Sequence, residues 1–174
     1  MIHKLADVEK GAEIGEGTNI WRWTHIQPQA KIGKNCSIGQ GCFIQDGVEV
    51  GDNCHIGNNV SLYKGVILKD DVFIGNNATF INVRKPKANN PVATSCYFKT
   101  IVNKGATIGA NATILCGVEV GENAQVGAGA MVAKSVPPAV TVIGNPAGIL
   151  VSDITGQAFV VSYEQYYIQK KRLN

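Results

Sequence analysis

The chain has 174 residues, a formal net charge of +3, 45% hydrophobic and 17% charged residues, which fits one folded domain with a short tail. It has no run of about 18 apolar residues and its N-terminus lacks a signal-peptide core, so we expect a cytoplasmic protein that does not span a membrane. The small positive charge does not indicate a nucleic-acid groove.

Residues 8–80 carry an unbroken repeat of six residues. Every sixth position is large and apolar, thirteen times in succession: Val8, Ile14, Ile20, Ile26, Ile32, Ile38, Ile44, Val50, Ile56, Leu62, Leu68, Ile74 and Phe80. A helix needs a period near 3.6 residues, so the sixfold period predicts short strands separated by tight bends. Three such units per coil would form a triangular prism with the apolar residues inside and adjacent coils paired in parallel.

Two other positions of the repeat support this interpretation. Three residues before each apolar position, from Gly11 to Asn77, the residue is mainly Gly, Asn or Asp, with Trp23 and Gln29 as exceptions. These types adopt a left-handed backbone at low cost. Two residues before it stands a small residue, among them three cysteines: Cys36, Cys42 and Cys54. The five cysteines form no CxxC pair and their number is odd, which favours reduced thiols over a disulfide framework.

The repeat breaks between Phe80 and Val102, which are 22 residues apart and therefore out of phase. The residues between them contain two prolines and several basic side chains but no sixfold pattern, so we expect residues 82–100 to leave the prism as a loop. Long loops without a repeat of their own are usually functional in a compact domain.

A second run of apolar positions extends from Val102 to Val132, after which the repeat stops. We therefore expect a β-helix domain over residues 1–150 and a C-terminal extension over residues 151–174. In the extension, residues 153–157 predict a turn. Residues 158–169 are rich in aromatic and β-branched types, which predicts a strand or hairpin that caps the open edge of the prism.

The hexads and their ending at residues 127–148, GAGAMVAKSVPPAVTVIGNPAG, resemble those of hexapeptide-repeat acyltransferases, and the resemblance covers about 150 residues. It implies an all-β fold, a left-handed parallel β-helix, in a homotrimer with sites between subunits. It also implies acetyl-CoA as cosubstrate and no metal.

Three stretches resemble a narrower group, the bacterial N-acetyltransferases of nucleotide-linked 3-amino sugars, which serve O-antigen and other surface-glycan synthesis. They are IWRWTHI at 20–26, NNVSLYKGVILKDDVFIG at 58–75 and TFINVRKPKA at 79–88. The valine at position 83 makes this stretch more similar to the enzymes acting on UDP-2-acetamido-3-amino-2,3-dideoxy-glucuronate. Relatives acting on dTDP-3-amino-3,6-dideoxyhexoses more often have an acidic residue at this position. Lys87 follows proline where the group usually has arginine, and a lysine lacks the bidentate fork of arginine.

The resemblance implies two sets of site residues. Those expected to bind the nucleotide sugar are His25, Trp23, Asn59, Tyr63, Asn82, Arg84 and Lys87. Those expected to bind acetyl-CoA are Gly109, Gly127, Ala128, Ala133, Lys134 and Pro146. The small residues would leave a groove open for the pantetheine arm, although bend formation explains them equally well. Trp21 and Trp23 could frame the nucleobase or pack at a subunit contact.

Asn82 is the expected catalytic residue. A sugar amine between electron-withdrawing carbons should have a pKa around 8, by analogy with an α-amino group, so a useful fraction is neutral without a strong general base. An asparagine cannot accept a full proton, and its expected role is therefore to orient the amine by a hydrogen bond.

The sequence is also compatible with other functions. The acceptor could be a dTDP-linked 3-amino-3,6-dideoxyhexose, or a hydroxyl deprotonated by His25 or His55. A γ-class carbonic anhydrase shares the prism but needs three convergent histidines, and the 30-residue gap between His25 and His55 places these two on different faces. A non-catalytic β-helix scaffold is the alternative outside enzymes.

Overall fold

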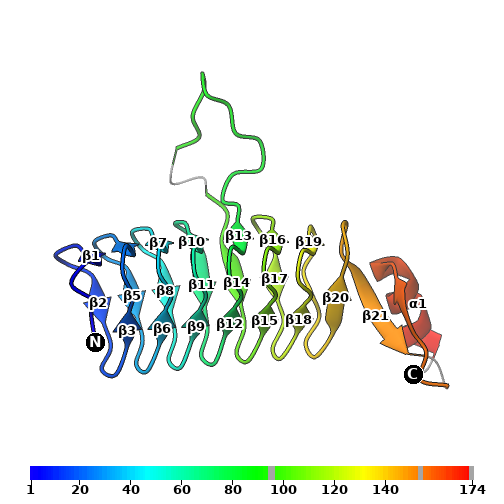
Figure 1. Cartoon of the computed structure of the whole chain (residues 1–174). Coiled ribbons are helices and arrows are strands. Elements are labelled where there is room, and N and C mark those ends of the chain that lie inside the picture. The colour runs from blue at the N-terminus through cyan, green and yellow to red at the C-terminus, as the bar shows by residue number, and fades with distance from the viewer. Residues whose placement is uncertain (94–96, 153–154, 173–174) are drawn as a thin grey trace.

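The computed structural model describes residues 1–93, 97–152 and 155–172, and it confirms the predicted fold class (Figure 1). The chain forms a left-handed parallel β-helix with three flat sheets. Paired residues such as Asp7 and His25 are 18 positions apart, so three hexads make one coil.

Each sheet forms one face of the prism. The first face consists of β1 (Asp7–Val8), β4 (His25–Ile26), β7 (Phe43–Ile44), β10 (Ser61–Leu62), β13 (Thr79–Phe80), β16 (Thr113–Ile114) and β19 (Met131–Val132). The second face consists of β2 (Glu13–Ile14), β5 (Lys31–Ile32), β8 (Glu49–Val50), β11 (Val66–Leu68), β14 (Thr100–Val102) and β17 (Glu119–Val120). The third face consists of β3 (Asn19–Ile20), β6 (Ser37–Ile38), β9 (His55–Ile56), β12 (Phe73–Ile74), β15 (Thr107–Ile108), β18 (Gln125–Val126), β20 (Thr141–Ile143), β21 (Gly148–Ser152) and β22 (Ala158–Val161). We call the edges corner 1–2, corner 2–3 and corner 3–1 after the faces that they join.

The hexad apolar residues form the core. From Ile20 to Phe80 and from Val102 to Val132, every one of them is buried, whereas Val8 and Ile14 are half-buried in the first coil. The aliphatic column is therefore continuous through the prism. Its burial supplies the apolar stabilisation that the short strands alone could not.

The corners have the left-handed backbone that the sequence predicts. Asn59 and Asn77 have φ values of 57° and 58°, and the two exceptions in residue type, Trp23 and Gln29, have φ values of 60° and 63°. The sixfold geometry thus imposes the left-handed conformation even where the residue type does not favour it.

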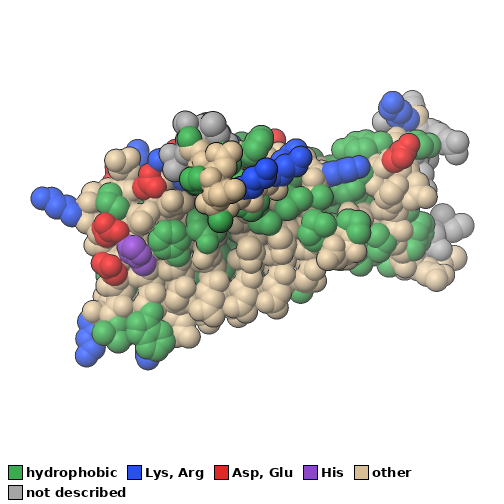
Figure 2. All heavy atoms as spheres, turned by 90° about the horizontal axis from the view of Figure 1, so that it is seen from above, with side chains coloured by type: hydrophobic (Ala, Val, Ile, Leu, Met, Phe, Trp, Pro, Cys, Tyr) green, Lys and Arg blue, Asp and Glu red, His purple; other side chains and the backbone are tan. Residues whose placement is uncertain are grey.

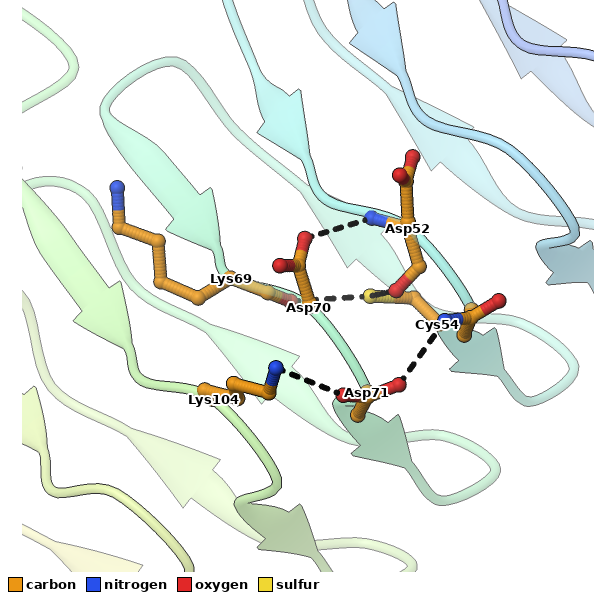
Figure 3. A network of polar contacts seen from close by, with 7 residues as sticks. Asp52, Cys54, Lys69, Asp70, Asp71 and Lys104 are labelled. Atoms are coloured by element: carbon orange, nitrogen blue, oxygen red, sulfur yellow. Dashed lines mark hydrogen bonds and ion pairs between the residues drawn. The ribbon is translucent and has the colours of Figure 1, made fainter.

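Buried thiols join successive coils. Cys42 Sγ donates to the Gly57 carbonyl at 3.0 Å, and Cys54 Sγ donates to the Lys69 carbonyl at 3.1 Å (Figure 3). Burial raises the pKa of Cys42 to about 11, so the protonated thiol is the donor. The four described cysteines are free, as predicted, and Cys96 lies outside the described residues.

The predicted loop projects from corner 1–2 between β13 and β14 (Figure 1). Val66 pairs with Thr100, 34 positions later, so 16 residues are added to the ordinary coil of 18 without disturbing the register. The loop packs tightly at its base, because a Cβ on Gly65 would lie 2.9 Å from the Phe98 carbonyl oxygen.

The prism extends beyond the point at which the sequence repeat stops. Val136 is buried and bridges Val120 in parallel, and β20 pairs in parallel with β18. The parallel coils therefore continue past the last hexad of the sequence pattern, within the residues 1–150 expected for the β-helix. Antiparallel pairing begins with β21 at Gly148, close to the expected boundary of the extension.

The C-terminal extension is only partly the strand that we expected. Strand β22 pairs antiparallel with β21, but α1 (Tyr163–Arg172) is a helix. Gln165 N donates to Ser162 Oγ at 3.1 Å, and Ser162 N donates to Gln165 Oε1 at 2.8 Å. This is a capping box, which starts the helix despite its aromatic residues. The turn predicted at 153–157 lies partly outside the described residues, and no helix in the described part of the chain is both long and apolar enough to cross a bilayer.

Candidate functional site

The predicted site residues fall at two corners on either side of the first face. Corner 1–2 and its loop carry Tyr63, Asn82, Arg84, Lys87, Ala133 and Lys134. Corner 3–1 carries Trp23, Asn59, Gly109, Gly127 and Ala128. His25 lies on the first face between them, in β4. A single chain therefore does not bring all of these residues into one pocket.

Asn82 lies at the base of the loop, two residues after β13, and is half-buried. Its side chain forms no hydrogen bond with any described residue, so its amide is available to a ligand. The equivalent position one coil earlier is Lys64, whose Nζ lies 2.6 Å from Asp46 Oδ2. Asn82 is thus a neutral polar residue at the position that carries one member of an ion pair in the preceding coil.

The loop carries cations at its base and along its length. The Arg84 guanidinium lies 5.3 Å from the centre of the Phe98 ring, which holds it at the stem. Lys87 lines a cavity of about 320 Å³ within the loop, together with Pro86 and Tyr97. Seen from above, a row of Lys and Arg side chains runs from the loop toward the C-terminal end (Figure 2). This face could bind an anionic ligand.

His25 is held by a carboxylate on the first face. Its Nε2 lies 2.7 Å from Glu9 Oε1 and 3.9 Å from Asp7 Oδ2. Its ring lies 5.5 Å from that of Phe43, which in turn lies 5.9 Å from that of Tyr63. The two predicted residues His25 and Tyr63 are therefore connected through an aromatic side chain and share one surface.

His55 lies on the third face, in β9, so the two histidines of the repeat are on different faces as predicted. Its ring stacks on that of Phe73 at 5.2 Å and an interplanar angle of 4°. Within the described ranges, no group of three or more His, Cys, Asp or Glu residues is placed to hold a metal ion.

Three of the residues expected to bind acetyl-CoA share a cavity of about 330 Å³ at the C-terminal end: Ala133, Lys134 and Pro146. Val160, Val161, Ser162 and Tyr163 of the extension complete its wall. Lys134 Nζ lies 5.9 Å from the centre of the Tyr163 ring, and the Tyr163 hydroxyl donates to the Lys134 carbonyl at 3.4 Å. Burial raises the pKa of Tyr163, so the hydroxyl stays protonated. The sequence did not predict this wall, because no residue pattern places the C-terminal extension against Lys134.

Gly109 and Gly127 have a structural reason for lacking a side chain. A Cβ on Gly109 would lie 2.4 Å from the backbone nitrogen of Ala128, and one on Gly127 would lie 2.7 Å from Ile143 Cγ2. Stacking of the coils therefore requires glycine at Gly109 in particular, whether or not a ligand passes there. Ala128 is exposed at the same corner.

Asn59 and Trp23 are both left-handed corner residues. Asn59 Nδ2 donates to Asn77 Oδ1 at 3.2 Å, so its amide connects two coils. Trp23 is 61% exposed, with the Arg22 guanidinium 5.6 Å from its ring. The left-handed corner and the hydrogen bond between coils account for an asparagine at position 59. The exposed Trp23 ring is accessible to a partner or ligand.

The bacterial transferase hexapeptide family (six repeats) matches residues 1–46, 47–82 and 99–134. These ranges cover more than half of the chain and omit the loop. The chain belongs to this family. The hexapeptide repeat of succinyl-transferase also matches, at residues 29–64.

Two curated relatives match shorter stretches. A serine acetyltransferase of Buchnera aphidicola is 46% identical over 71 residues, which are 41% of this chain and 23% of the relative. The dTDP-3-amino-3,6-dideoxy-alpha-D-galactopyranose 3-N-acetyltransferase of Aneurinibacillus thermoaerophilus is 51% identical over 51 residues, which are 29% of this chain and 27% of that protein. The chain spans about a quarter of the length of these relatives.

Solved structures share the fold. The N-acyltransferase AntD of Bacillus cereus, in complex with dTDP and 3-hydroxybutyryl-CoA, has a TM-score of 0.55 at 19% identity, covering 99% of this chain and 85% of that one. A UDP-N-acetylglucosamine acyltransferase of Campylobacter jejuni has a TM-score of 0.56 at 18% identity, covering 90% and 76%. At these identities the likeness extends to the fold alone.

Proposed function

We propose that this protein transfers the acetyl group of acetyl-CoA to the 3-amino group of a nucleotide-linked amino sugar. The best candidate for the acceptor is UDP-2-acetamido-3-amino-2,3-dideoxy-glucuronate, a precursor for O-antigen or another surface glycan. The observation that carries the proposal is the half-buried, unbonded amide of Asn82 at the base of the inserted loop, in a chain of the hexapeptide transferase family. The chain also matches part of a dTDP-3-amino-sugar 3-N-acetyltransferase, and the acceptor that the name of that relative gives belongs to the same class.

The chemistry needs little from the protein beyond positioning. The neutral amine attacks the thioester carbonyl carbon, the C–S bond breaks, and coenzyme A leaves as a thiol after the ammonium loses its proton. The Asn82 side-chain oxygen would accept a hydrogen bond from the amine and so direct its lone pair at the carbonyl. Arg84 and Lys87 on the loop would pair with the diphosphate or the sugar carboxylate.

Acetyl-CoA would occupy the C-terminal end of the prism. The cavity lined by Lys134 and Pro146 has an apolar wall and a single cation, which suits the nucleotide end of coenzyme A. The row of basic side chains toward that end would attract its phosphates (Figure 2).

We further propose that the protein acts as a homotrimer with sites between subunits. The predicted residues lie at two corners separated by the first face, so corner 1–2 of one copy and corner 3–1 of the next would complete a site. Closed rotational symmetry repeats such a contact three times.

A second candidate is acetyl transfer to a hydroxyl, with His25 as base. The 2.7 Å contact between His25 Nε2 and Glu9 Oε1 favours it, because a carboxylate partner fixes the orientation of the imidazole ring. The matched stretch of the serine acetyltransferase is compatible with it.

One assay separates these functions. The purified protein is incubated with acetyl-CoA and UDP-linked or dTDP-linked 3-amino sugars, with 3-hydroxy sugars and serine as controls, and free thiol is followed. We expect thiol release with the UDP-linked amine. Release with hydroxyl acceptors alone would establish the second candidate, and release with none would remove the proposed function.

A further inference from the structure

The two stems of the loop leave the prism at corner 1–2 (Figure 1). Arg84 lies on the first stem, two residues after Asn82, and Phe98 lies on the second stem, two residues before Thr100 of β14. The Arg84 guanidinium carbon lies 5.3 Å from the centre of the Phe98 ring. This contact, which we call the root contact, therefore closes the loop where it meets the prism. The site predicted from the sequence includes Arg84 but not Phe98.

Two corner glycines provide the surface on which the root contact lies. A Cβ on Gly117, in the coil after the loop, would lie 3.4 Å from Phe98 Cδ1 and 3.8 Å from Arg84 Nη2. A Cβ on Gly65, in the coil before the loop, would lie 2.9 Å from the Phe98 carbonyl oxygen. The lack of side chains at these two positions therefore lets Phe98 lie directly against the corner, with Arg84 beside it.

The second stem is tied to the same two glycines by hydrogen bonds. Thr100 is buried, and its backbone nitrogen donates to the Gly65 carbonyl at 2.9 Å. The Thr100 Oγ1 accepts a hydrogen bond from Gly117 N at 3.3 Å. Phe98 therefore belongs to a stem whose place on the prism is fixed on both sides.

The first stem is held less firmly. Ile81 N donates to the Ile114 carbonyl at 2.9 Å, which ties the residue before Asn82 to the next coil. Within the residues that the structure describes, positions 82–84 form no hydrogen bond. Arg84 is therefore positioned through the Phe98 ring and not through its own backbone.

We propose that Phe98 is a positioning residue, which holds the Arg84 guanidinium against corner 1–2 and so fixes the loop beside Asn82. A guanidinium that lies over a ring keeps the N–H groups at its edge free to donate hydrogen bonds. The root contact thus orients Arg84 without occupying the donors with which it would bind an anionic acceptor. The consequence for turnover rests on the proposed function, whereas the contact itself can be tested without a substrate.

The test without substrate is cleavage of the folded protein by trypsin after Arg84. Trypsin takes the arginine side chain into a binding pocket, so the guanidinium must first leave the Phe98 ring. Phe98→Leu keeps an apolar side chain against Gly117 but removes the ring face. We expect cleavage after Arg84 to become about threefold to thirtyfold faster, the range for one lost cation–π contact. Phe98→Tyr retains the ring and should be cleaved like wild type, and cleavage after Lys87, further along the loop, is the internal reference.

The test with substrate compares Michaelis constants. Phe98→Leu should raise the KM for the nucleotide sugar about threefold to thirtyfold and leave the KM for acetyl-CoA and the melting temperature unchanged. In an Arg84→Gln background, Phe98→Leu should have no further effect, because the ring acts through Arg84. The matched control is Phe73→Leu on the third face, since Phe73 is 42% exposed against 47% for Phe98 and its ring stacks on that of His55. This control should leave both Michaelis constants unchanged.

Two results would overturn the inference. One is cleavage after Arg84 at the same rate in Phe98→Leu as in wild type. The other is a rise of the acceptor KM in Phe98→Leu that is equally large in the Arg84→Gln background, because the ring would then act independently of Arg84. If cleavage follows the expected pattern but even the wild type acetylates no 3-amino sugar, the root contact stands and the proposed function is wrong.

Discussion

Asn82 is the residue at which loop and prism meet, and its amide has no described protein partner. If it orients the amine, Asn82→Ala should lower kcat about tenfold to a hundredfold, the effect of losing one hydrogen bond of roughly 1–3 kcal/mol. No titrating group is lost, so the pH profile should keep its rise near the pKa of the acceptor amine, about 8. Steady-state rates between pH 6 and 9 would measure both.

The histidines provide the comparison for that experiment. His25→Asn and His55→Asn should each lower the rate less than Asn82→Ala, because neither is needed as a base for an amine acceptor. A thousandfold loss of rate in either variant, with disappearance of the acid limb of its pH–rate profile, would instead identify that histidine as the base. Asn82 would then lie near the site without orienting the amine.

Gly109 distinguishes a structural from a functional glycine. Gly109→Ala places a Cβ 2.4 Å from the Ala128 nitrogen, so we expect a loss of about 1–3 kcal/mol in the free energy of unfolding. Gly129→Ala is the matched control, since its Cβ would meet no atom within 4 Å and only its φ of 69° is unfavourable, at about 1–2 kcal/mol. Urea denaturation measures both. If Gly109→Ala kept full stability but raised the KM for acetyl-CoA, the cofactor role expected from the sequence would hold.

Residue type alone could predict burial but not every role. The aliphatic positions are buried because the period fixes which side chains point inward. Asn59 was expected to bind substrate, yet its amide connects coils at a left-handed corner. Asparagine is common both at such corners and in binding sites, so sequence cannot separate the two. The opposite holds for Asn58, which the sequence did not single out. Only the structure shows that its side-chain oxygen accepts a hydrogen bond from Gln40 N, which leaves its NH2 group as a donor.

At the scale of elements, the loop can be removed without disturbing the register. Deleting residues 83–98 joins Asn82 to Lys99 and restores six-residue spacing between Phe80 and Val102. Lys99→Gly would supply the corner glycine found at Gly65 and Gly117. We expect an unchanged far-ultraviolet circular dichroism spectrum and melting point, because the core lies in the hexads.

Turnover of the same variant should fall about a hundredfold or more, because the cations that position the acceptor are lost with the loop. The thiol-release assay measures this. Loss of the melting transition together with activity would mean that the loop supports the fold, and retention of activity would mean that it does not contact the acceptor.

The extension shows why element type was harder to predict than the repeat. Residues 158–169 combine β-branched and aromatic types, which favour a strand, and β22 confirms that for Ala158–Val161. The capping box of Ser162 and Gln165 then starts a helix that those propensities do not favour. A local capping signal therefore decided the structure over the average composition of the segment.

At the scale of the whole molecule, the two corners explain why the sequence can suggest candidate site residues but not how they would assemble into one site. Asn82 at corner 1–2 and Trp23 at corner 3–1 flank the first face, and a contact between copies that joins these two corners would bring them into one site. Contacts between the subunits of a closed oligomer leave no separate pattern in the sequence. The positions that face another subunit follow the same six-residue repeat as the positions that face solvent.

Shared sites predict complementation between inactive variants. In an equal mixture of Asn82→Ala and Trp23→Ala chains, random association into trimers would give about a quarter of the sites an intact Asn82 from one copy and an intact Trp23 from the next. We therefore expect co-expressed, differently tagged variants to recover about a quarter of the wild-type rate at subsaturating nucleotide sugar, where each variant alone is strongly impaired. Purification through both tags in turn selects the mixed trimers, in which one site of three is intact, so the recovered rate should then rise to about a third of wild type. Activity that stays at the average of the two variants would show that each site is built within one chain. In that case Asn82 and Trp23 could not serve the same acceptor.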